Sequence, residues 1–288
     1  MSDTTLSGLI TAEALAEHLA TPDLVILDIR SSVDGGGKAA FEAGHLPGAV
    51  HTDYVADGWR AKVGAAPGLL PPLDHLAGLA GRLGIRPQSQ VVIVPAGVSA
   101  MDYAAAARVY WTLKTMGHGQ QAILDGGFKG WSDQGRPVEA GASSPVAAAP
   151  YPVVMQQRLR STADATLVAS RSRLATLVDA RATSYFEGRE KSPDAARPGR
   201  IPGAVSRDYT QAFDPDTGRL KPAATLEAIF GSVPKGPVIS YCNTGHTAAL
   251  AWFVLSEVLG REEVALYDGS MSDWTQDPDR PVQTGPAG

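Results

Sequence analysis

The chain has 288 residues, 44% of them hydrophobic, and a formal net charge of −5. This length suits two domains of roughly 130 residues each, and the acidic balance disfavours nucleic acid or a membrane surface as a partner. Cys242 is the single cysteine, so the chain has no internal disulfide and no cysteine–histidine cluster for zinc, and we expect no cofactor.

Residues 1–5 lack the basic and apolar regions of a secretory signal. No stretch of the sequence reaches the roughly 18 consecutive apolar residues of a membrane span. From the sequence we therefore expect a soluble, cytoplasmic protein.

Short apolar runs alternate with helical patterns along the chain. Thr11 is expected to cap the first helix, and the first helix of the second half is expected after Thr162. The expected strands are 24–27, 91–94, 121–124, 176–179, 237–241 and 263–267. The expected helices are 11–19, 99–116, 168–174, 223–230 and 247–259. This alternation predicts an α/β fold with mainly parallel sheets flanked by helices on both faces.

Three motifs occur twice in the same order, about 150 residues apart. The pairs are Val25-Ile26-Leu27-Asp28-Ile29-Arg30 with Thr176-Leu177-Val178-Asp179-Ala180-Arg181, Gly44-His45-Leu46-Pro47-Gly48-Ala49-Val50 with Gly199-Arg200-Ile201-Pro202-Gly203-Ala204-Val205, and Leu124-Asp125-Gly126-Gly127-Phe128-Lys129-Gly130-Trp131 with Tyr267-Asp268-Gly269-Ser270-Met271-Ser272-Asp273-Trp274. A repeat of this length indicates a duplicated domain.

Small residues and prolines dominate 139–150 and predict a linker. We therefore predict a first domain over 8–138, a linker over 139–161 and a second domain over 162–288.

The two halves can be compared with each other. Residues that recur are expected to serve the shared fold, and residues found in one half are candidates for function. On this basis three pairs of recurring residues are interpreted as structural: Asp28 with Asp179, Arg30 with Arg181, and Trp131 with Trp274.

Cys242 lies between a predicted strand and a predicted helix. Backbone N–H groups and the positive end of a helix dipole converge at such a turn and favour the nucleophilic thiolate. A small buried cysteine without chemistry is the alternative. The corresponding segment of the first half begins at Pro95, has no cysteine, and is expected to be some three residues longer. This asymmetry favours a chemical role for Cys242. Because there is no second thiol, any group bound to the Cys242 sulfur must be transferred to an acceptor outside the chain.

Together these motifs resemble the tandem rhodanese (sulfurtransferase) family over nearly the whole chain. The shared features are Asp-x-Arg after a strand, the Pro-Gly-Ala turn, a six-residue loop opened by cysteine, and Tyr-Asp-Gly-Ser followed by a tryptophan. The resemblance implies two rhodanese-like domains, the first catalytically inactive. It also implies a persulfide on Cys242, with the loop 242–247 wrapped around the sulfur.

The resemblance further implies that sulfur moves from a donor such as thiosulfate to a thiophile such as cyanide or a thiol, in two half-reactions. The N–H groups of the loop are expected to hold the negative charge, and Gly245 supplies backbone freedom. Thr247 is expected to cap the following helix and Thr244 to hydrogen-bond the sulfur. For both threonines, simple loop-building is the alternative.

The residues after Cys242 leave the donor open. Thiosulfate-specific members of the family usually carry Arg or Lys there, and mercaptopyruvate-specific members carry small residues such as Gly-Ser-Gly. Asn243, Thr244 and His246 match neither pattern. His246 is the one loop side chain able to carry positive charge, mainly below neutral pH, and a solvated bystander is its alternative role.

Basic residues outside the loop also depart from the family. Tyr185 stands where the family often has a donor-binding Arg. Arg200 replaces the usual His of the Gly-His-x-Pro-Gly-Ala motif and is a candidate for restoring the missing positive charge at the donor, with an exposed turn as the alternative. Arg189, Lys191 and Arg197 are candidate substitutes for the missing cation, with ordinary surface charge as the alternative. Thiosulfate is therefore only slightly preferred over 3-mercaptopyruvate as the donor.

Two other functions also depend on a cysteine at such a turn. A cysteine-dependent phosphatase needs a longer loop and an Arg six residues after the cysteine to clamp the phosphoryl oxygens, where this chain has Ala248. A persulfide carrier that receives sulfur from a partner protein is the non-catalytic alternative, and a thiol or sulfur-carrier protein is a candidate acceptor. We expect a monomer, because two domains in one chain already supply the walls of a site.

Overall fold

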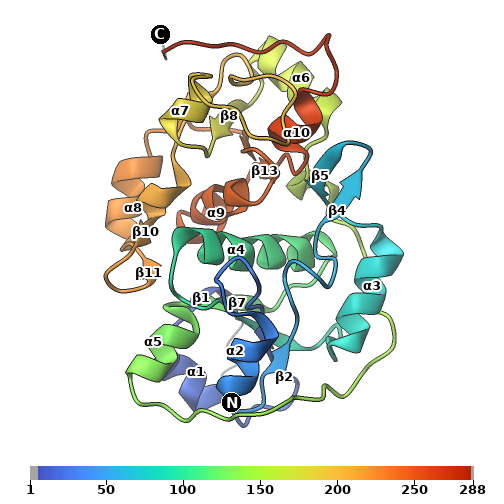
Figure 1. The fold of residues 1–288 in the computed structure, drawn as a ribbon, viewed down its shortest axis with the longest axis vertical. Helices are drawn as coiled ribbons and strands as arrows, with labels where there is room; N and C mark the ends of the chain where they lie inside the picture. Colours follow the sequence, from blue (N-terminus) through green and yellow to red (C-terminus); the bar gives the residue numbers. More distant parts are fainter. Residues whose placement is uncertain (1–5, 287–288) are drawn as a thin grey trace. The chain divides into compact units, whose positions relative to one another are not determined.

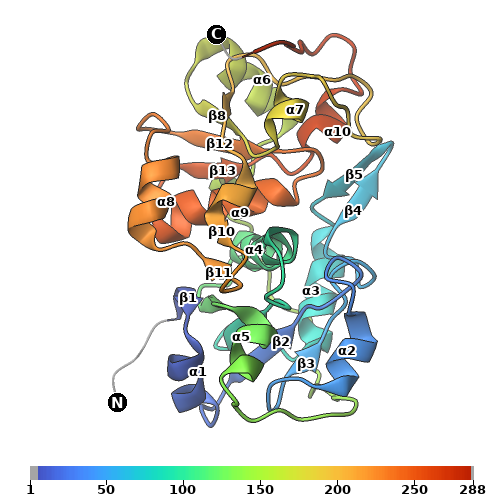
Figure 2. The same cartoon turned by 60° about the vertical axis from the view of Figure 1, so that its left-hand side comes forward.

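The computed structural model describes residues 6–286, which form two compact units (Figures 1 and 2). Unit 1 comprises 6–59, 71–156 and 213–220, and unit 2 comprises 60–70, 157–212 and 221–286. Each unit therefore includes one short hairpin from the other half of the sequence. The predicted boundaries do not anticipate this exchange, because a sequence repeat locates elements but not the body against which a hairpin packs.

Unit 1 is built on a five-stranded parallel sheet with the order β1-β7-β6-β2-β3. The strands are β1 (Ser7–Ile10), β2 (Leu24–Asp28), β3 (Val50–His51), β6 (Gln90–Val94) and β7 (Gln121–Leu124). The helices are α1 (Ala12–His18), α2 (Gly37–Ala43), α3 (Leu73–Arg82), α4 (Ala100–Thr115) and α5 (Gly127–Asp133). All four residues of β7 are buried, as expected of a parallel sheet covered on both faces.

Unit 2 is built on a four-stranded parallel sheet with the order β13-β12-β8-β9. The strands are β8 (Thr176–Asp179), β9 (Val205–Ser206), β12 (Val238–Tyr241) and β13 (Val264–Leu266). The helices are α6 (Ala163–Ser172), α7 (Thr183–Phe186), α8 (Ala223–Phe230), α9 (Thr247–Phe253) and α10 (Ser270–Trp274), with 3₁₀ turns η1 (Gln157–Leu159) and η2 (Tyr209–Ala212) and a π-helical turn η3 (Val254–Val258).

The exchanged hairpins are antiparallel. Strands β4 (Ala61–Val63) and β5 (Ala66–Leu69) belong to unit 2, and β10 (Phe213–Asp214) and β11 (Arg219–Leu220) belong to unit 1. In unit 1, the Phe213 ring lies 6.1 Å from the ring of Tyr103, and the Leu220 N–H donates to Asp125 at 3.2 Å.

Most predicted elements are present, with local differences. Thr11 and Thr162 cap α1 and α6 by accepting N–H groups three residues later, each at 3.2 Å. Helix α6 begins at 163 rather than 168 because this cap starts it. The predicted helix 247–259 is α-helical to Phe253 and then π-helical. Residues 139–156 of the predicted linker are extended but bound to unit 1, for example through Ala148 N–H to the Gly81 carbonyl at 2.8 Å, whereas 157–161 belong to unit 2 and include η1.

The repeated residues make equivalent contacts in the two units, as predicted for structural groups. Arg30 pairs with Asp28 at 2.8 Å and Arg181 with Asp179 at 2.6 Å, and all four side chains are buried. The fully buried indoles of Trp131 and Trp274 donate to the proline carbonyls at 137 and 281. Within residues 6–286, no helix has both the length and the apolar composition of a membrane span.

Candidate active site

Cys242 lies at the carboxyl end of β12, and its side chain is buried, with 1% exposed. Its N–H donates to the Ser270 hydroxyl at 2.9 Å, and its carbonyl accepts the Met271 N–H at 3.1 Å. Both backbone polar groups of the cysteine are thus fixed by the turn that begins α10. This places the sulfur where strand, loop and turn meet.

Ser270 organises this turn and is the functional residue that sequence reasoning missed. Its Oγ accepts N–H groups from Cys242 and from Gly245 at 3.1 Å, and it donates to the Tyr267 carbonyl at 2.9 Å. The same Oγ lies 3.9 Å from Cys242 Sγ. Because both lone pairs and the proton have partners, the hydroxyl is a fixed brace beside the sulfur.

The repeat contained a signal for Ser270. In the first half the same motif position holds Gly127, and both residues have positive φ, +58° for Gly127 and +51° for Ser270. A left-handed backbone is unfavourable for a residue with a Cβ. A serine where the other copy has glycine therefore indicates that its hydroxyl is needed there.

The two loops have the same length, so the predicted three-residue difference is wrong. Five residues separate β6 from α4, and five separate β12 from α9. Phe128 N–H donates to the Pro95 carbonyl just as Met271 N–H donates to that of Cys242, which makes Pro95 the counterpart of the cysteine. The prediction failed because the loop glycines, Gly97 and Gly245, occupy different loop positions and misalign the sequences.

The backbone N–H groups of the two loops have different partners. In unit 1 the N–H groups of Ala96, Gly97 and Val98 donate to the Asp102 carboxylate at 2.9, 2.7 and 3.1 Å. The counterparts of Ala96 and Gly97 are Asn243 and Thr244, whose N–H groups have no acceptor within residues 6–286.

This difference traces to one position on the following helix. Asp102 is the third residue of α4, and the third residue of α9 is Ala249, which is fully buried. The carboxylate in unit 1 shows that this kind of loop binds an anion through consecutive N–H groups. In unit 2 no side chain of the described chain competes for those of Asn243 and Thr244.

Arg181 brings positive charge to the cysteine loop. Its Nη1 donates to Asn243 Oδ1 at 3.3 Å, whereas the corresponding nitrogen of Arg30 donates to the Ala40 carbonyl at 3.2 Å. Burial alone would lower the pKa of Arg181, but the charges of Asp179 and, to a smaller extent, of Cys242 raise it. The guanidinium therefore stays charged. Arg181, which recurs in both halves and is expected to be structural, also contacts the cysteine loop in unit 2.

Tyr209, at the start of η2, is a second residue that the sequence did not single out. Burial raises the pKa of its phenol, and the charges of Asp208 and Cys242 raise it further. The phenol therefore remains protonated at neutral pH and lies near enough to the cysteine to feel its charge. The residue recurs in the first half as Tyr54, at the same distance after the Pro-Gly-Ala turn, so the comparison of the two halves did not mark it as a candidate for function.

The predicted loop residues have defined places. Gly245 has a φ of +69°, a left-handed conformation that uses the backbone freedom expected of it. Thr247 does not cap the helix: it is the first helical residue, and His246 holds the N-cap position without a side-chain cap. No hydrogen bond joins the Thr244 hydroxyl to Sγ in the described chain, and the hydroxyl at the sulfur is that of Ser270. His246 is buried, with 6% exposed.

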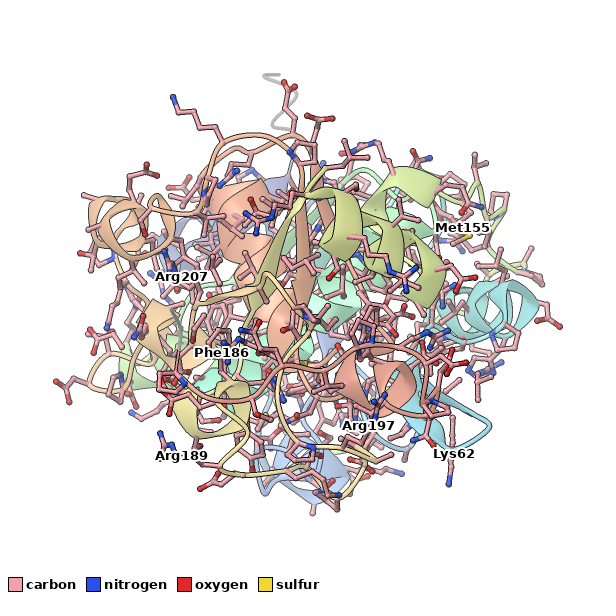
Figure 3. All side chains as sticks on the ribbon, turned by 90° about the horizontal axis from the view of Figure 1, so that it is seen from above. Lys62, Met155, Phe186, Arg189, Arg197 and Arg207 are labelled. Atoms are coloured by element: carbon pink, nitrogen blue, oxygen red, sulfur yellow. The ribbon has the colours of Figure 1, made fainter. Side chains whose placement is uncertain are left out.

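The candidate cations outside the loop have other partners. The Arg200 guanidinium is buried and donates to the carbonyls of Phe186, Gly285 and Pro286 at 3.3, 2.6 and 3.2 Å. Arg189 is 64% exposed, pairs with Glu187 at 2.8 Å, and lies at the outer edge of the view in Figure 3.

The other two candidates, Lys191 and Arg197, donate to backbone carbonyls within unit 2. No hydrogen bond or ion pair described for these four cations reaches residues 242–246. Nor does any group of three His, Cys, Asp or Glu side chains in the described chain suit a metal ion.

Comparisons with known proteins agree with the motifs. Residues 11–134 and 162–277 each match the rhodanese-like domain. The chain is 31% identical over 276 residues to a thiosulfate sulfurtransferase of Azotobacter vinelandii, covering 93% of this chain and 94% of that protein. It is 32% identical over 281 residues to a 3-mercaptopyruvate sulfurtransferase of Homo sapiens, covering 93% and 91%.

A solved structure gives the same result. The crystal structure of SseA, a 3-mercaptopyruvate sulfotransferase from Escherichia coli, matches with a TM-score of 0.77 and 28% identity, covering 91% of this chain and 98% of that chain. The resemblance predicted from the motifs is thereby confirmed. The chain belongs to the rhodanese-like family and carries the family's domain twice.

Proposed function

We propose that the protein is a sulfurtransferase that moves sulfane sulfur from thiosulfate, through a persulfide on Cys242, to cyanide or another thiophile. The observation that carries this proposal is the cysteine loop itself. A buried thiol stands beside two consecutive N–H groups that have no acceptor within residues 6–286, and their counterparts in unit 1 hold a carboxylate. Relatives named thiosulfate sulfurtransferase at 31% identity support it.

In the first half-reaction the Cys242 thiolate attacks the outer sulfur of thiosulfate. A bond forms between the two sulfurs, the sulfur–sulfur bond of thiosulfate breaks, and sulfite leaves with the electron pair. In the second half-reaction cyanide attacks the terminal sulfur of the persulfide, and thiocyanate leaves as the thiolate is restored. The enzyme-bound sulfur carries one negative charge before and after each step.

The residues around Cys242 act on that charge. We assign the N–H groups of Asn243 and Thr244 to the donor anion and the persulfide, because fixed donors stabilise charge without reorganising during the reaction. Arg181 adds a permanent positive charge behind Asn243. Ser270 holds the loop by its two accepted hydrogen bonds. His246 and Tyr209 are assigned to the wall of the site. Unit 1, with Pro95 at the cysteine position, is assigned a structural role without turnover.

3-Mercaptopyruvate is the second candidate donor. The side chains at 243–245 are uncharged, and His246 is the one loop residue able to carry positive charge, so the loop offers a dianion such as thiosulfate no Arg or Lys of its own. Relatives named 3-mercaptopyruvate sulfurtransferase match at 32% identity over a similar length. A persulfide carrier, loaded by a partner protein, is the remaining alternative. Arg200 and Arg189 are left out of the proposed site because of their other partners.

A thiocyanate assay with both donors side by side tests these proposals. Turnover with either donor that disappears in Cys242→Ser supports the enzyme, and the ratio of kcat/KM values identifies the donor. A mass increase of about 32 Da without turnover would favour the carrier. Because Cys242 is the single cysteine, any persulfide detected is on that residue. Wild-type protein that neither gains this mass nor turns over would contradict the sulfurtransferase.

We further propose that the protein works as a cytoplasmic monomer on small-molecule donors and acceptors. One free thiol that must stay reduced suits a reducing compartment. Light scattering should give a mass near 30.0 kDa; a value near twice that mass would overturn the monomer.

A further inference from the structure

We infer that the β4–β5 hairpin, which comes from the first half of the sequence, positions the cysteine loop of unit 2, and that Gly68 is the contact through which it does so. The inference rests on the proposed role of Cys242. It assigns no chemistry to the hairpin: Gly68 is a positioning residue.

The hairpin packs against the turn that carries Ser270. Figures 1 and 2 both show β5 beside α10, although about 200 residues separate them along the chain. The Ser272 hydroxyl is shared between the Gly269 carbonyl at 2.8 Å and the Pro67 carbonyl at 3.2 Å, and the Leu70 N–H donates to Asp268 Oδ2 at 2.6 Å. Two backbone groups of the hairpin are thus tied to the segment 268–272.

Gly68 touches the cysteine loop directly. Its φ is +95°, and a Cβ built on it would lie 2.1 Å from the Thr244 carbonyl oxygen and 2.9 Å from the carbonyl carbon. Contacts this short do not occur between a side chain and a backbone, so no residue with a Cβ fits without moving the loop. The glycine lets two backbones meet.

The peptide group between Thr244 and Gly245 is therefore held from both sides. In a trans peptide the carbonyl and the N–H point in opposite directions. The Thr244 carbonyl faces Gly68, and the Gly245 N–H donates to Ser270 Oγ at 3.1 Å. A displacement of Thr244 away from Gly68 would also shift the adjoining peptide, which carries the Thr244 N–H, one of the two groups assigned to the anion.

The hairpin also supports the turn that carries Ser270, through Asp268. Asp268, with 1% exposed, accepts the Leu70 N–H and an Nε–H of Arg160 at 3.0 Å, and it stands two residues before Ser270. The carboxylate thereby fixes the start of the turn whose hydroxyl braces the loop. One hairpin thus acts on the Thr244–Gly245 peptide directly through Gly68 and indirectly through Asp268.

A matched pair of glycine substitutions tests the inference. Gly64 lies at the turn of the same hairpin with a φ of +59°, and a Cβ there would meet nothing within 4 Å. Gly64→Ala and Gly68→Ala both place a Cβ on a left-handed backbone, but only Gly68→Ala collides with Thr244. We expect Gly68→Ala to slow persulfide formation in a single turnover at least about 10-fold, and Gly64→Ala to remain near the wild-type rate.

Further readouts separate positioning from stability and from the proposed function. The thermal midpoints of the two variants should agree within a few degrees, and alkylation of Cys242 by iodoacetamide should change in Gly68→Ala even if wild-type protein accepts no sulfur from thiosulfate. Ser272→Ala, which removes the Pro67 contact together with the hydrogen bond to the Gly269 carbonyl, should slow the same step about two- to five-fold and is the test should Gly68→Ala not fold. Equal rates in Gly68→Ala and Gly64→Ala, or a wild-type rate in Ser272→Ala when Gly68→Ala does not fold, would overturn the inference.

Discussion

The two strand-to-helix loops of this protein, 95–99 and 242–246, have the same length and the same position in their sheets, yet side chains from different elements hold them in place. In unit 1 the brace is Asp102 on the following helix, which takes the N–H groups of three consecutive residues. In unit 2 the brace is Ser270 on a neighbouring turn. The loop around the cysteine is held without using the N–H groups of Asn243 and Thr244.

Three positions account for this difference, and they are linked. Pro95 has no N–H to donate, and Gly127 has no hydroxyl to accept one, so the contact made by Cys242 and Ser270 has no equivalent in unit 1. Buried N–H groups need acceptors, and Asp102 provides them. A loop of this kind can therefore be stable with or without an active thiol, but the choice of brace decides whether its N–H groups remain for an anion.

The largest loss of activity is expected when the carboxylate found in unit 1 is introduced at the equivalent position of unit 2. Ala249 occupies the position of Asp102, and Ala249→Asp should let a carboxylate compete with the donor for the N–H groups of Asn243 and Thr244. We expect kcat/KM for the sulfur donor to fall by at least about 100-fold. Steady-state thiocyanate formation measures this change.

Ala249→Asn is the control for this substitution, since it adds nearly the same volume without the charge. It should lose activity through crowding alone and remain well above Ala249→Asp. Equal losses in the two variants would mean that packing, and not occupation of the N–H groups, causes the effect.

Ser270 offers a smaller perturbation that makes unit 2 resemble unit 1. Ser270→Gly reproduces Gly127, and Ser270→Ala removes the hydroxyl but keeps the Cβ. Both variants should slow persulfide formation roughly 10- to 100-fold, because the Cys242 and Gly245 N–H groups lose their acceptor. Stopped-flow mixing with thiosulfate, with sulfite release as the signal, measures the rate.

The stabilities of the two Ser270 variants should differ even if their rates agree. Ser270 has a φ of +51°, so Ser270→Gly relieves strain that Ser270→Ala keeps, and it should be more stable by about 1 kcal/mol. A Ser270→Ala variant with the wild-type rate would show that the hydroxyl does not organise the loop.

The sequence predicted the features that local patterns encode. The caps at Thr11 and Thr162, the buried strands and the paired Asp28–Arg30 and Asp179–Arg181 depend on neighbours in sequence, so patterns locate them. Cys242 stays a predicted site residue, drawn from its position between a strand and a helix and from the first half, which has no cysteine there. The rule that recurring residues are structural has a limit at Arg181, since one of its nitrogens donates to Asn243 in unit 2.

The rest depends on contacts between segments far apart in the chain. The exchange of hairpins, the contact of Gly68 with Thr244 and the burial of Arg200 under the C-terminal segment leave no periodicity in the sequence. Thr247 failed as a cap because helix α9 begins one residue earlier than its hydroxyl would need. Asp102 carries no marker in the sequence, since an acidic side chain in the first turn of a helix is common for electrostatic reasons.

The smallest effect on activity is expected at Asp102, where a substitution should change the stability of unit 1 and leave turnover unchanged. Burial raises the pKa of Asp102 to about 6 from an ordinary 3.8, against the lowering by its three N–H donors and with a further increase from Asp34. A carboxyl whose pKa is higher in the folded state than in the unfolded state favours folding most when it is protonated. Its contribution is therefore complete below about pH 4 and is lost as the pH rises through about 6.

Asp102→Asn removes this titration while keeping the shape of the side chain. The free energy of unfolding of the wild type, relative to the variant, should fall by an amount on the order of 3 kcal/mol between about pH 4 and about pH 7. Urea unfolding across this range measures the difference, and thiocyanate formation should match the wild type throughout. The prediction is contradicted if the wild type instead becomes more stable than the variant as the pH rises. That result would mean that the three N–H groups stabilise the ionised carboxylate of Asp102 by more than burial destabilises it.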